Sequence, residues 1–269
     1  MWDSCFTPPS RISAQERECY RRWIKEKQDS DSHQALVLGV TPEIRAELFA
    51  FGYQVTCVDM SLDMILAMNE LLPEKMAEET LVRGNWLSVP LAKGHFDLVI
   101  GDAILPNVPW DDRVRLLSRI HGFLKPGGAF LTRAFCAPTV CRFPTVKEAL
   151  DAAGNKTALP FMQRSLELVL ELQYLTYSPS DHIGSFRKAK EALDQYLQNN
   201  PGRRTDEKVA ALIEHQYSFW FSRFLEKIFV YSSTVREEAE YRRYFSIDDH
   251  FETPDHDYGA LTPMYFLRK

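Results

Sequence analysis

Two positions, Gly39 and Asp59, carry the clearest chemical signal in this sequence. Each directly follows a short run of apolar and β-branched residues, at 36–38 and 55–58, of the kind that forms buried parallel strands. Gly39 allows a sharp turn in which the backbone approaches a ligand closely. A carboxylate at the end of the second strand would stand at the ligand-binding edge of a doubly wound sheet, where it can accept hydrogen bonds from both ribose hydroxyls. The spacing therefore predicts a nucleoside-binding site.

A helix must join these two strands and bring both positions to one edge. Pro42 suits the first turn of such a helix, where its missing N–H costs nothing. Residues 44–51 carry the helix, and Gly52 is a typical stop. The stretch from residue 35 to residue 59 therefore reads as one strand–helix–strand unit.

Five segments extend this pattern in order, from residue 35 to about residue 135. They are LVLGVTPEI, VTCVDMS, GNWLSVPL, FDLVIGDAILPNV and FLKPGGAFLTR. They resemble the glycine-rich loop, ribose-binding strand end, adenine-side loop, fourth strand and fifth strand of class I S-adenosylmethionine-dependent methyltransferases. The final segment, DYGALTPMYFLRK, resembles the last hairpin strand of that family.

The resemblance implies a Rossmann-like α/β fold. It predicts a doubly wound, mostly parallel sheet of seven strands, with the last strand antiparallel, and a helical insertion between strands five and six. It also implies S-adenosyl-L-methionine as the cofactor and in-line transfer of its methyl group. The long insertion and the lack of a basic segment are consistent with a small-molecule acceptor. The expected S-adenosylmethionine-binding domain comprises residues 31–137 and 241–269.

The cofactor contacts implied by the resemblance are glycine, polar and neighbouring residues of these segments. They are Gly39, Val40, Thr41, Glu43, Asp59, Met60, Asn85, Trp86 and Asp102. Asn85 has an amide suited to the adenine edge, and Trp86 has a flat face for the ring. A turn residue and a core residue are the respective alternatives.

The loop departs from the family pattern at Val37, Thr41 and Glu43. Val37 occupies the usual place of an acidic residue that holds the cofactor's amino group. Glu43 is expected to supply this charge instead, and the helix start near Ile44 is expected to favour the cofactor's carboxylate.

Residues 1–30 are expected to form an N-terminal lid segment over the cofactor. Ser13 and Glu16 have capping-box spacing at the start of a predicted helix over residues 14–27. The resemblance suggests that Arg11 pairs with the cofactor's carboxylate, since a planar guanidinium suits that group. The alternative is that the helix only packs on the sheet through its apolar residues.

Residues 138–240 are expected to form a helical insertion that acts as a substrate lid, because so long a connection must have structure of its own. Its last predicted helix, over residues 206–231, carries an aromatic stripe in which Trp220 and Phe224 are expected to contact an apolar acceptor. Arg133, at the carboxyl end of the fifth strand, is expected to face the substrate. The alternatives for the stripe are core packing and homodimer formation.

A catalytic base is needed only if the acceptor arrives protonated. His95 precedes the fourth strand at the opposite edge, and His121 ends a helix. His215 is predicted to be solvated, because it lies opposite the apolar stripe of its helix. His182, in the loop SPSDHIG, is therefore the candidate, with an ordinary loop histidine as the alternative.

Composition limits the class of protein. A net charge of −5 gives no electrostatic reason to expect a nucleic-acid or membrane partner. Five cysteines without a CxxC motif indicate free thiols and a cytoplasmic location. We expect no metal site, since the cluster of His250, Asp255, His256 and Asp257 reads as a solvated turn.

Two other functions fit the same architecture. A nicotinamide oxidoreductase is disfavoured, because a G-x-G-x-x-G motif would need glycine at Thr41 and Ile44. A non-catalytic binding or scaffold protein is the second alternative, motivated by the departures at Val37, Thr41 and Glu43.

Overall fold

The computed structural model describes residues 6–28, 33–72 and 79–269. The chain divides into two compact units. The sheet unit comprises Ile12–Phe135 and Thr234–Lys269. The helical unit comprises Cys136–Ser233 together with residues 6–11.

Seven strands form the sheet in the order β3-β2-β1-β4-β5-β9-β8. Their bounds are Gln34–Leu38 (β1), Gln54–Asp59 (β2), Thr80–Arg83 (β3), Phe96–Asp102 (β4), Leu124–Arg133 (β5), Ser246–Phe251 (β8) and Met264–Arg268 (β9). Strands β1 to β5 run parallel, and β9 pairs antiparallel with both β5 and β8. The predicted fold class, a mostly parallel seven-stranded sheet with the last strand antiparallel, is therefore confirmed.

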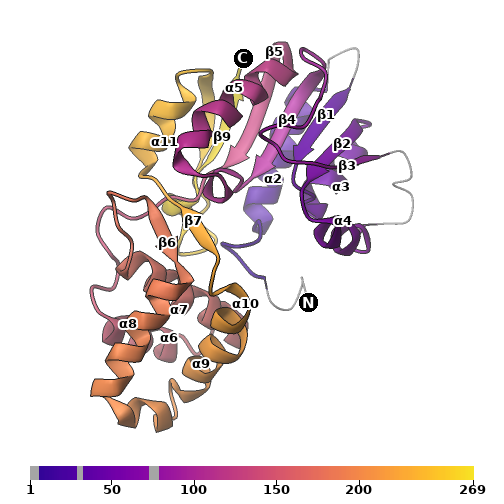
Figure 1. The fold of residues 1–269 in the computed structure, drawn as a ribbon. Helices are drawn as coiled ribbons and strands as arrows, with labels where there is room; N and C mark the ends of the chain where they lie inside the picture. Colours follow the sequence, from indigo (N-terminus) through magenta and orange to yellow (C-terminus); the bar gives the residue numbers. More distant parts are fainter. Residues whose placement is uncertain (1–5, 29–32, 73–78) are drawn as a thin grey trace. The chain divides into compact units, whose positions relative to one another are not determined.

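Helices cover both faces of the sheet (Figure 1). On one face, α2 (Ala14–Glu26) lies against α3 (Pro42–Ala50), and α4 (Leu62–Asn69) follows β2. On the other, α5 (Arg113–Phe123) packs on β4 and β5 beside α11 (Thr234–Tyr241). Covering both faces buries β1 and β4 almost completely, which is why these strands read as continuous apolar runs.

The N-terminal helix α2 belongs to the sheet unit. Its predicted capping box is present, because Ser13 Oγ accepts the Glu16 N–H and the Glu16 carboxylate accepts the Ser13 N–H. Trp23 is fully buried and contacts Phe266 of β9, with ring centroids 6.0 Å apart. The structure divides the expected segment 1–30 after Arg11, and α2 packs on the sheet unit through its apolar side. Residues 1–5, 29 and 30 lie outside the described residues, and a lid role of this segment stays a prediction.

The helical unit is built around α7 (Phe161–Leu175), which packs against α6 (Val146–Asn155) and α8 (Phe186–Asn199). It also contains a two-stranded antiparallel ribbon, β6 (Ile183–Ser185) and β7 (Ile228–Val230). This ribbon was not predicted. Gly184 permits it, because a Cβ there would lie 2.2 Å from a ring carbon of Tyr231.

The single helix predicted over residues 206–231 is wrong. The segment contains α9 (Ala210–His215), a π-helix (Gln216–Phe221) and α10 (Ser222–Phe224) before β7 begins. The ladder of β6 and β7 captures the β-branched and aromatic residues at 228–230, which a helix would otherwise have used.

The end of the predicted insertion also differs. Residues 234–240 were assigned to the insertion, but α11 groups with the sheet unit. A buried ion pair joins Arg113 of α5 to Glu237 of α11, with 2.8 Å between nitrogen and oxygen.

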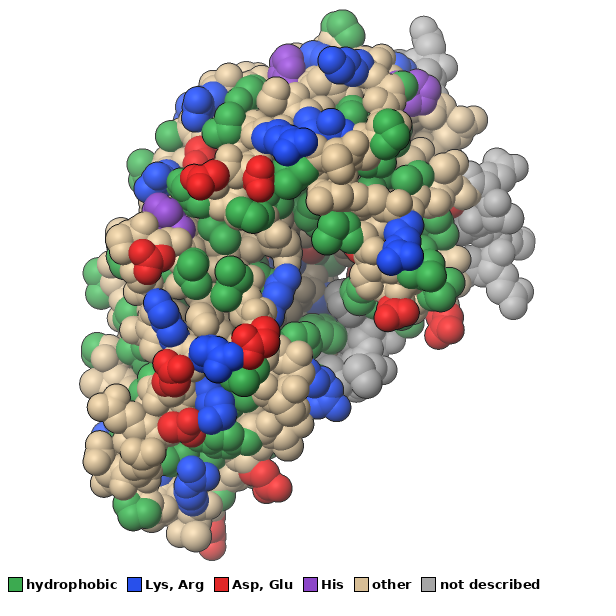
Figure 2. Space-filling view, in the orientation of Figure 1, with side chains coloured by type: hydrophobic (Ala, Val, Ile, Leu, Met, Phe, Trp, Pro, Cys, Tyr) green, Lys and Arg blue, Asp and Glu red, His purple; other side chains and the backbone are tan. Residues whose placement is uncertain are grey.

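On the face of the molecule in Figure 2, basic and acidic side chains are interspersed.

Candidate cofactor site

The turn after β1 has the geometry that a ligand-binding loop requires. Gly39 has a φ of +101°, in the left-handed region that favours glycine. Its N–H donates to the Val58 carbonyl at 2.8 Å, which fixes the turn against the end of β2. A Cβ at Gly39 would meet no atom within 4 Å, so this side of the backbone faces open space.

Asp59 ends β2 at the same edge of the sheet. One carboxylate oxygen, Oδ1, accepts the N–H of Ser61 at 2.8 Å, which fixes the side chain. Among the described residues, the other oxygen has no hydrogen-bond partner in the protein. A fixed, half-buried carboxylate with one available oxygen is a suitable acceptor for ribose hydroxyls.

The predicted adenine-side loop is attached to the glycine turn. The indole N–H of Trp86 donates to the Val58 carbonyl at 2.7 Å, so Trp86 and Gly39 share one acceptor. The Oδ1 of Asn85 accepts the Leu87 N–H at 2.9 Å, and the residue is exposed. Met60 beside Asp59 is 60% exposed, whereas Val40 is buried. The structure thus brings the nucleoside-side residues together.

Glu43 lies in the first turn of α3 and is 8% exposed. Thr41 precedes this helix without capping it through its side chain. The negative charge of Glu43 acts on Asp102 at the end of β4 and contributes to the raised pKa of Asp102. Glu43, which is predicted to hold the cofactor's amino group, therefore lies with Thr41 at the start of α3.

Asp102 belongs to a buried group of four residues, which we call the ionic cluster: Glu16, Tyr20, Asp102 and Arg133. Arg133 donates from Nε to Asp102 Oδ1 at 2.8 Å and from a terminal nitrogen to Oδ2 at 3.0 Å. Its other terminal nitrogen contacts Glu16 at 3.0 Å. The Tyr20 hydroxyl lies 3.4 Å from Asp102. The cluster joins α2 to the carboxyl ends of β4 and β5.

The pKa values of the two carboxyl groups of this cluster shift in opposite directions. Burial raises the pKa of Asp102, with the charges of Glu16 and Glu43 adding to it against Arg133. Burial also acts to raise the pKa of Glu16, but Arg133 and the hydrogen bonds from His256 and the Ser13 N–H outweigh it, so this pKa is lowered.

The surroundings of Arg133 differ from what the sequence suggested. The expectation was that it faces the substrate, but none of its side chain is exposed. Although burial acts to lower the pKa of Arg133, Asp102 and Glu16 raise it, so the guanidinium stays charged. The structure shows Arg133 binding two carboxylates of its own chain, and its contact with a substrate stays a prediction.

The remaining predicted site residues lie in the helical unit. Arg11 is half-buried, and its backbone N–H donates to the Thr7 carbonyl at 3.2 Å. His182 has a φ of +58°, and its Nδ1 lies 3.5 Å from the Tyr177 hydroxyl. Trp220 is 3% exposed and packs against Phe224, with centroids 5.9 Å apart. Trp220 is thus a core residue of its unit.

Sequence reasoning missed a second buried polar group, the Ser165 hub: Ser165, His215, Gln216 and Trp220. Ser165 Oγ lies 2.7 Å from His215 Nδ1 and 3.0 Å from nitrogen atoms of Gln216 and Trp220. His215 was predicted to be solvated, but it is half-buried and stacks on Phe219. A π-helix follows His215, and its residues do not keep the 100° angular spacing of an α-helix. The prediction made from α-helical spacing is therefore wrong for His215. The available signal was a serine within the apolar run of α7.

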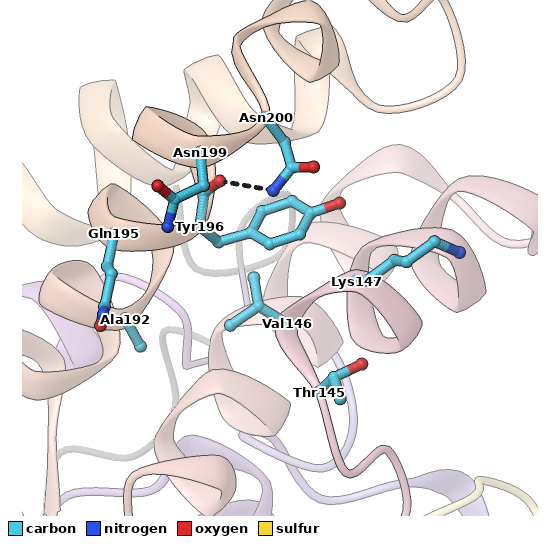
Figure 3. Close-up of a pocket in the computed structure, with 8 residues that line it drawn as sticks. All are labelled: Thr145, Val146, Lys147, Ala192, Gln195, Tyr196, Asn199 and Asn200. Atoms are coloured by element: carbon cyan, nitrogen blue, oxygen red, sulfur yellow. Dashed lines mark hydrogen bonds between the residues drawn. The ribbon is translucent and has the colours of Figure 1, made fainter.

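An open hollow of about 470 Å³ lies elsewhere in the helical unit, between the start of α6 and the end of α8 (Figure 3). Lys147, Tyr196 and the amides of Gln195, Asn199 and Asn200 are among its lining residues. None of the predicted site residues lines it.

In 6–28, 33–72 and 79–269, no group of three or more His, Cys, Asp or Glu side chains is arranged to hold a metal ion. Over the same residues, no helix combines the length and apolar character needed to cross a membrane.

The residues at the sheet edge fit a nucleoside cofactor, because a glycine turn facing open space stands beside a carboxylate with an available oxygen.

Residues 36–132 match a family model described as a methyltransferase domain. The chain is 30% identical over 155 residues to a demethylmenaquinone methyltransferase of Lactococcus lactis subsp. lactis (strain IL1403). The match covers 53% of this chain and 59% of that relative, so the chain spans less than two thirds of its length.

Solved structures share the fold. A putative Zn-dependent alcohol dehydrogenase from Rhodobacter sphaeroides matches with a TM-score of 0.60 and 16% identity, over 100% of this chain and 94% of that one. The 1,6-didemethyltoxoflavin-N1-methyltransferase of Burkholderia thailandensis, with bound S-adenosylhomocysteine, matches with a TM-score of 0.53 and 12% identity, over 94% and 77%. A SAM-dependent methyltransferase from Methanosarcina mazei matches with a TM-score of 0.52 and 16% identity, over 91% and 94%.

At these identities the structural matches show the fold alone, whereas the family model and the curated relative add sequence similarity. The resemblance and the cofactor predicted from the sequence are confirmed. The match of residues 36–132 to a methyltransferase-domain model and the similarity to the curated relative thus agree with the resemblance to class I S-adenosylmethionine-dependent methyltransferases.

Proposed function

We propose that this protein is an enzyme that binds S-adenosylmethionine at the carboxyl edge of its sheet and transfers the methyl group to a small-molecule acceptor. The observation that carries the proposal is the junction at Val58. Its carbonyl holds both the Gly39 turn and the Trp86 indole beside Asp59, within the matched domain. Three residues from separate loops are thus fixed at one ligand-binding edge.

Each residue of this edge has a role in binding. Asp59 accepts the ribose hydroxyls, and Asn85 and Trp86 contact the adenine. Glu43 and the backbone at Thr41 hold the amino-acid part of the cofactor. The bound cofactor supplies an electrophilic methyl group on a sulfonium, and the protein contributes proximity and in-line alignment.

A small-molecule acceptor is supported by two observations. The curated relative is named for a small molecule, demethylmenaquinone. The net charge is −5, and charges of both signs are interspersed on the face in Figure 2. Interspersed charges offer no continuous basic surface to a polyanion.

Several parts of the proposal rest on the sequence. They are the lid role of the insertion, the acceptor contacts of Trp220 and Phe224, His182 as base, and a homodimer formed through the helical insertion. A cytoplasmic location also belongs here, supported by free thiols at Cys19, Cys57, Cys136 and Cys141.

Calorimetry and thermal denaturation with S-adenosylmethionine, S-adenosylhomocysteine and NADH test the proposal. Both sulfur nucleosides should bind, and a ligand at a hundred times its Kd stabilises the fold by about 2.7 kcal/mol. Asp59→Asn keeps an acceptor for the Ser61 N–H but loses the charge, so affinity should fall by about tenfold or more at unchanged stability.

Wild-type protein that responds only to NADH would support the oxidoreductase alternative. A protein that binds none of these nucleotides would favour the non-catalytic alternative. Equal affinity of the wild type and Asp59→Asn for S-adenosylhomocysteine would remove Asp59 from the site.

A further inference from the structure

Arg45 is a fully buried charged residue in the first turns of α3, directly after the loop that departs from the family pattern. Its Nε donates to Glu79 at 2.7 Å, and one terminal nitrogen contacts both Glu79 and Asn69. These partners lie before β3 and at the end of α4, so Arg45 is held from two sides. The remaining terminal nitrogen lies 3.4 Å from the carbonyl oxygen of Val40.

That last contact fixes the orientation of a peptide group in the cofactor loop. In a planar trans peptide, the carbonyl and the N–H point in opposite directions. Because the Val40 carbonyl points to the buried guanidinium, the Thr41 N–H points away from it. The structure shows no acceptor for this N–H within the described part of the chain.

Among the described residues, no side chain caps the start of α3 by a hydrogen bond, and Pro42 at its first position has no N–H to offer. Anchoring of the Val40 carbonyl by Arg45 therefore takes the place of a cap, and it leaves the loop N–H available for an anion.

We propose that Arg45 is the positioning residue of the cofactor loop. Held by Glu79 and Asn69, it fixes the Val40–Thr41 peptide so that the Thr41 N–H binds the carboxylate of the cofactor's amino-acid part. This inference rests on the proposed function, because it assigns a subsite of the same cofactor.

The test compares two ligands that differ in the amino-acid part. S-adenosylhomocysteine carries the carboxylate, whereas 5′-methylthioadenosine has the same nucleoside and thioether sulfur without it. The double variant Arg45→Met with Glu79→Leu removes both members of the buried pair, and such apolar replacement often leaves stability unchanged. We expect its affinity for S-adenosylhomocysteine to fall by about tenfold, and its affinity for 5′-methylthioadenosine to stay within about twofold.

The matched control is Arg113→Met with Glu237→Leu, which removes a buried pair of the same unit away from the loop. If Arg45 were only structural, both double variants would affect the two ligands alike. A second variant tests the N–H directly: Thr41 has a φ of −55°, which proline can adopt, so Thr41→Pro deletes this donor without disturbing the ion pair.

Thr41→Pro should lower the affinity for S-adenosylhomocysteine about tenfold and leave the affinity for 5′-methylthioadenosine unchanged. The inference is overturned if Thr41→Pro, or a folded Arg45 double variant, binds S-adenosylhomocysteine as the wild type does. It is also overturned if both ligands weaken by the same factor. Wild-type protein that binds neither ligand would instead refute the proposed function.

Discussion

The ionic cluster of the sheet unit and the Ser165 hub of the helical unit are both buried polar groups, and they are built on opposite principles. The ionic cluster of the sheet unit places Arg133 against the carboxylates of Asp102 and Glu16. In the Ser165 hub of the helical unit, Ser165 Oγ accepts N–H groups from Gln216 and Trp220. Its own hydrogen can then only go to His215 Nδ1, so His215 is neutral.

This difference determines what each group tolerates. Charges in a dry interior need their partners, because an uncompensated buried charge is very costly. A neutral hub loses less when one member is removed, but it depends on each hydrogen having one defined position. The ionic cluster should therefore be sensitive to loss of charge, and the hub should be sensitive to a gained proton.

Arg133→Met should give the largest effect, because it leaves the buried carboxylates of Glu16 and Asp102 without their cation. We expect a loss of about 3–5 kcal/mol in the free energy of unfolding, measured by urea denaturation. Arg22→Met is the control, since the Arg22–Asp249 pair is exposed and should contribute about 1 kcal/mol or less. Equal effects of the two variants would show that the ionic cluster does not stabilise the unit.

Ser165→Ala should give an intermediate effect. It leaves the buried indole N–H of Trp220 and Nδ1 of His215 without their hydrogen-bond partner, whereas the Gln216 amide keeps its hydrogen bond to the Ser165 carbonyl. We expect a loss of about 2–3 kcal/mol in the same measurement. Ser222→Ala, an exposed serine of α10, should change stability by less than about 0.5 kcal/mol. A comparable loss in both variants would refute the hub.

His215 should give the smallest effect, seen as a pH dependence. Burial, with the charge of Arg223, lowers the pKa of His215. The unfolded chain therefore binds this proton first, and stability falls as the pH drops below the ordinary value near 6.5. One pKa unit corresponds to about 1.4 kcal/mol.

His215→Gln keeps an acceptor for the Ser165 hydroxyl and removes the titration. Unfolding measured between pH 7.5 and 5.5 should show a smaller pH slope in this variant than in the wild type. Identical slopes would mean that His215 is not held neutral by the hub. His121, whose pKa is also lowered by burial, contributes equally to both proteins.

The features that sequence reasoning predicted correctly have local causes. The capping box of α2 needs only Ser13 and Glu16, and the turn after β1 needs only a glycine. The features it missed depend on contacts between distant residues. The π-helix after His215 and the β6–β7 ribbon arise because α7 and β6 lie beside segments that are remote in the chain.

The amino-acid sequence by itself determined the alternation of strands and helices, the glycine turn and the carboxylate at the end of β2. These follow from periodicity and backbone preference within a few neighbouring residues. Only the tertiary structure decided the partners of Arg133, the burial of His215 and the anchoring of Val40 by Arg45. A long polar side chain can reach several elements, so its role is set by which of them the fold brings within hydrogen-bonding distance.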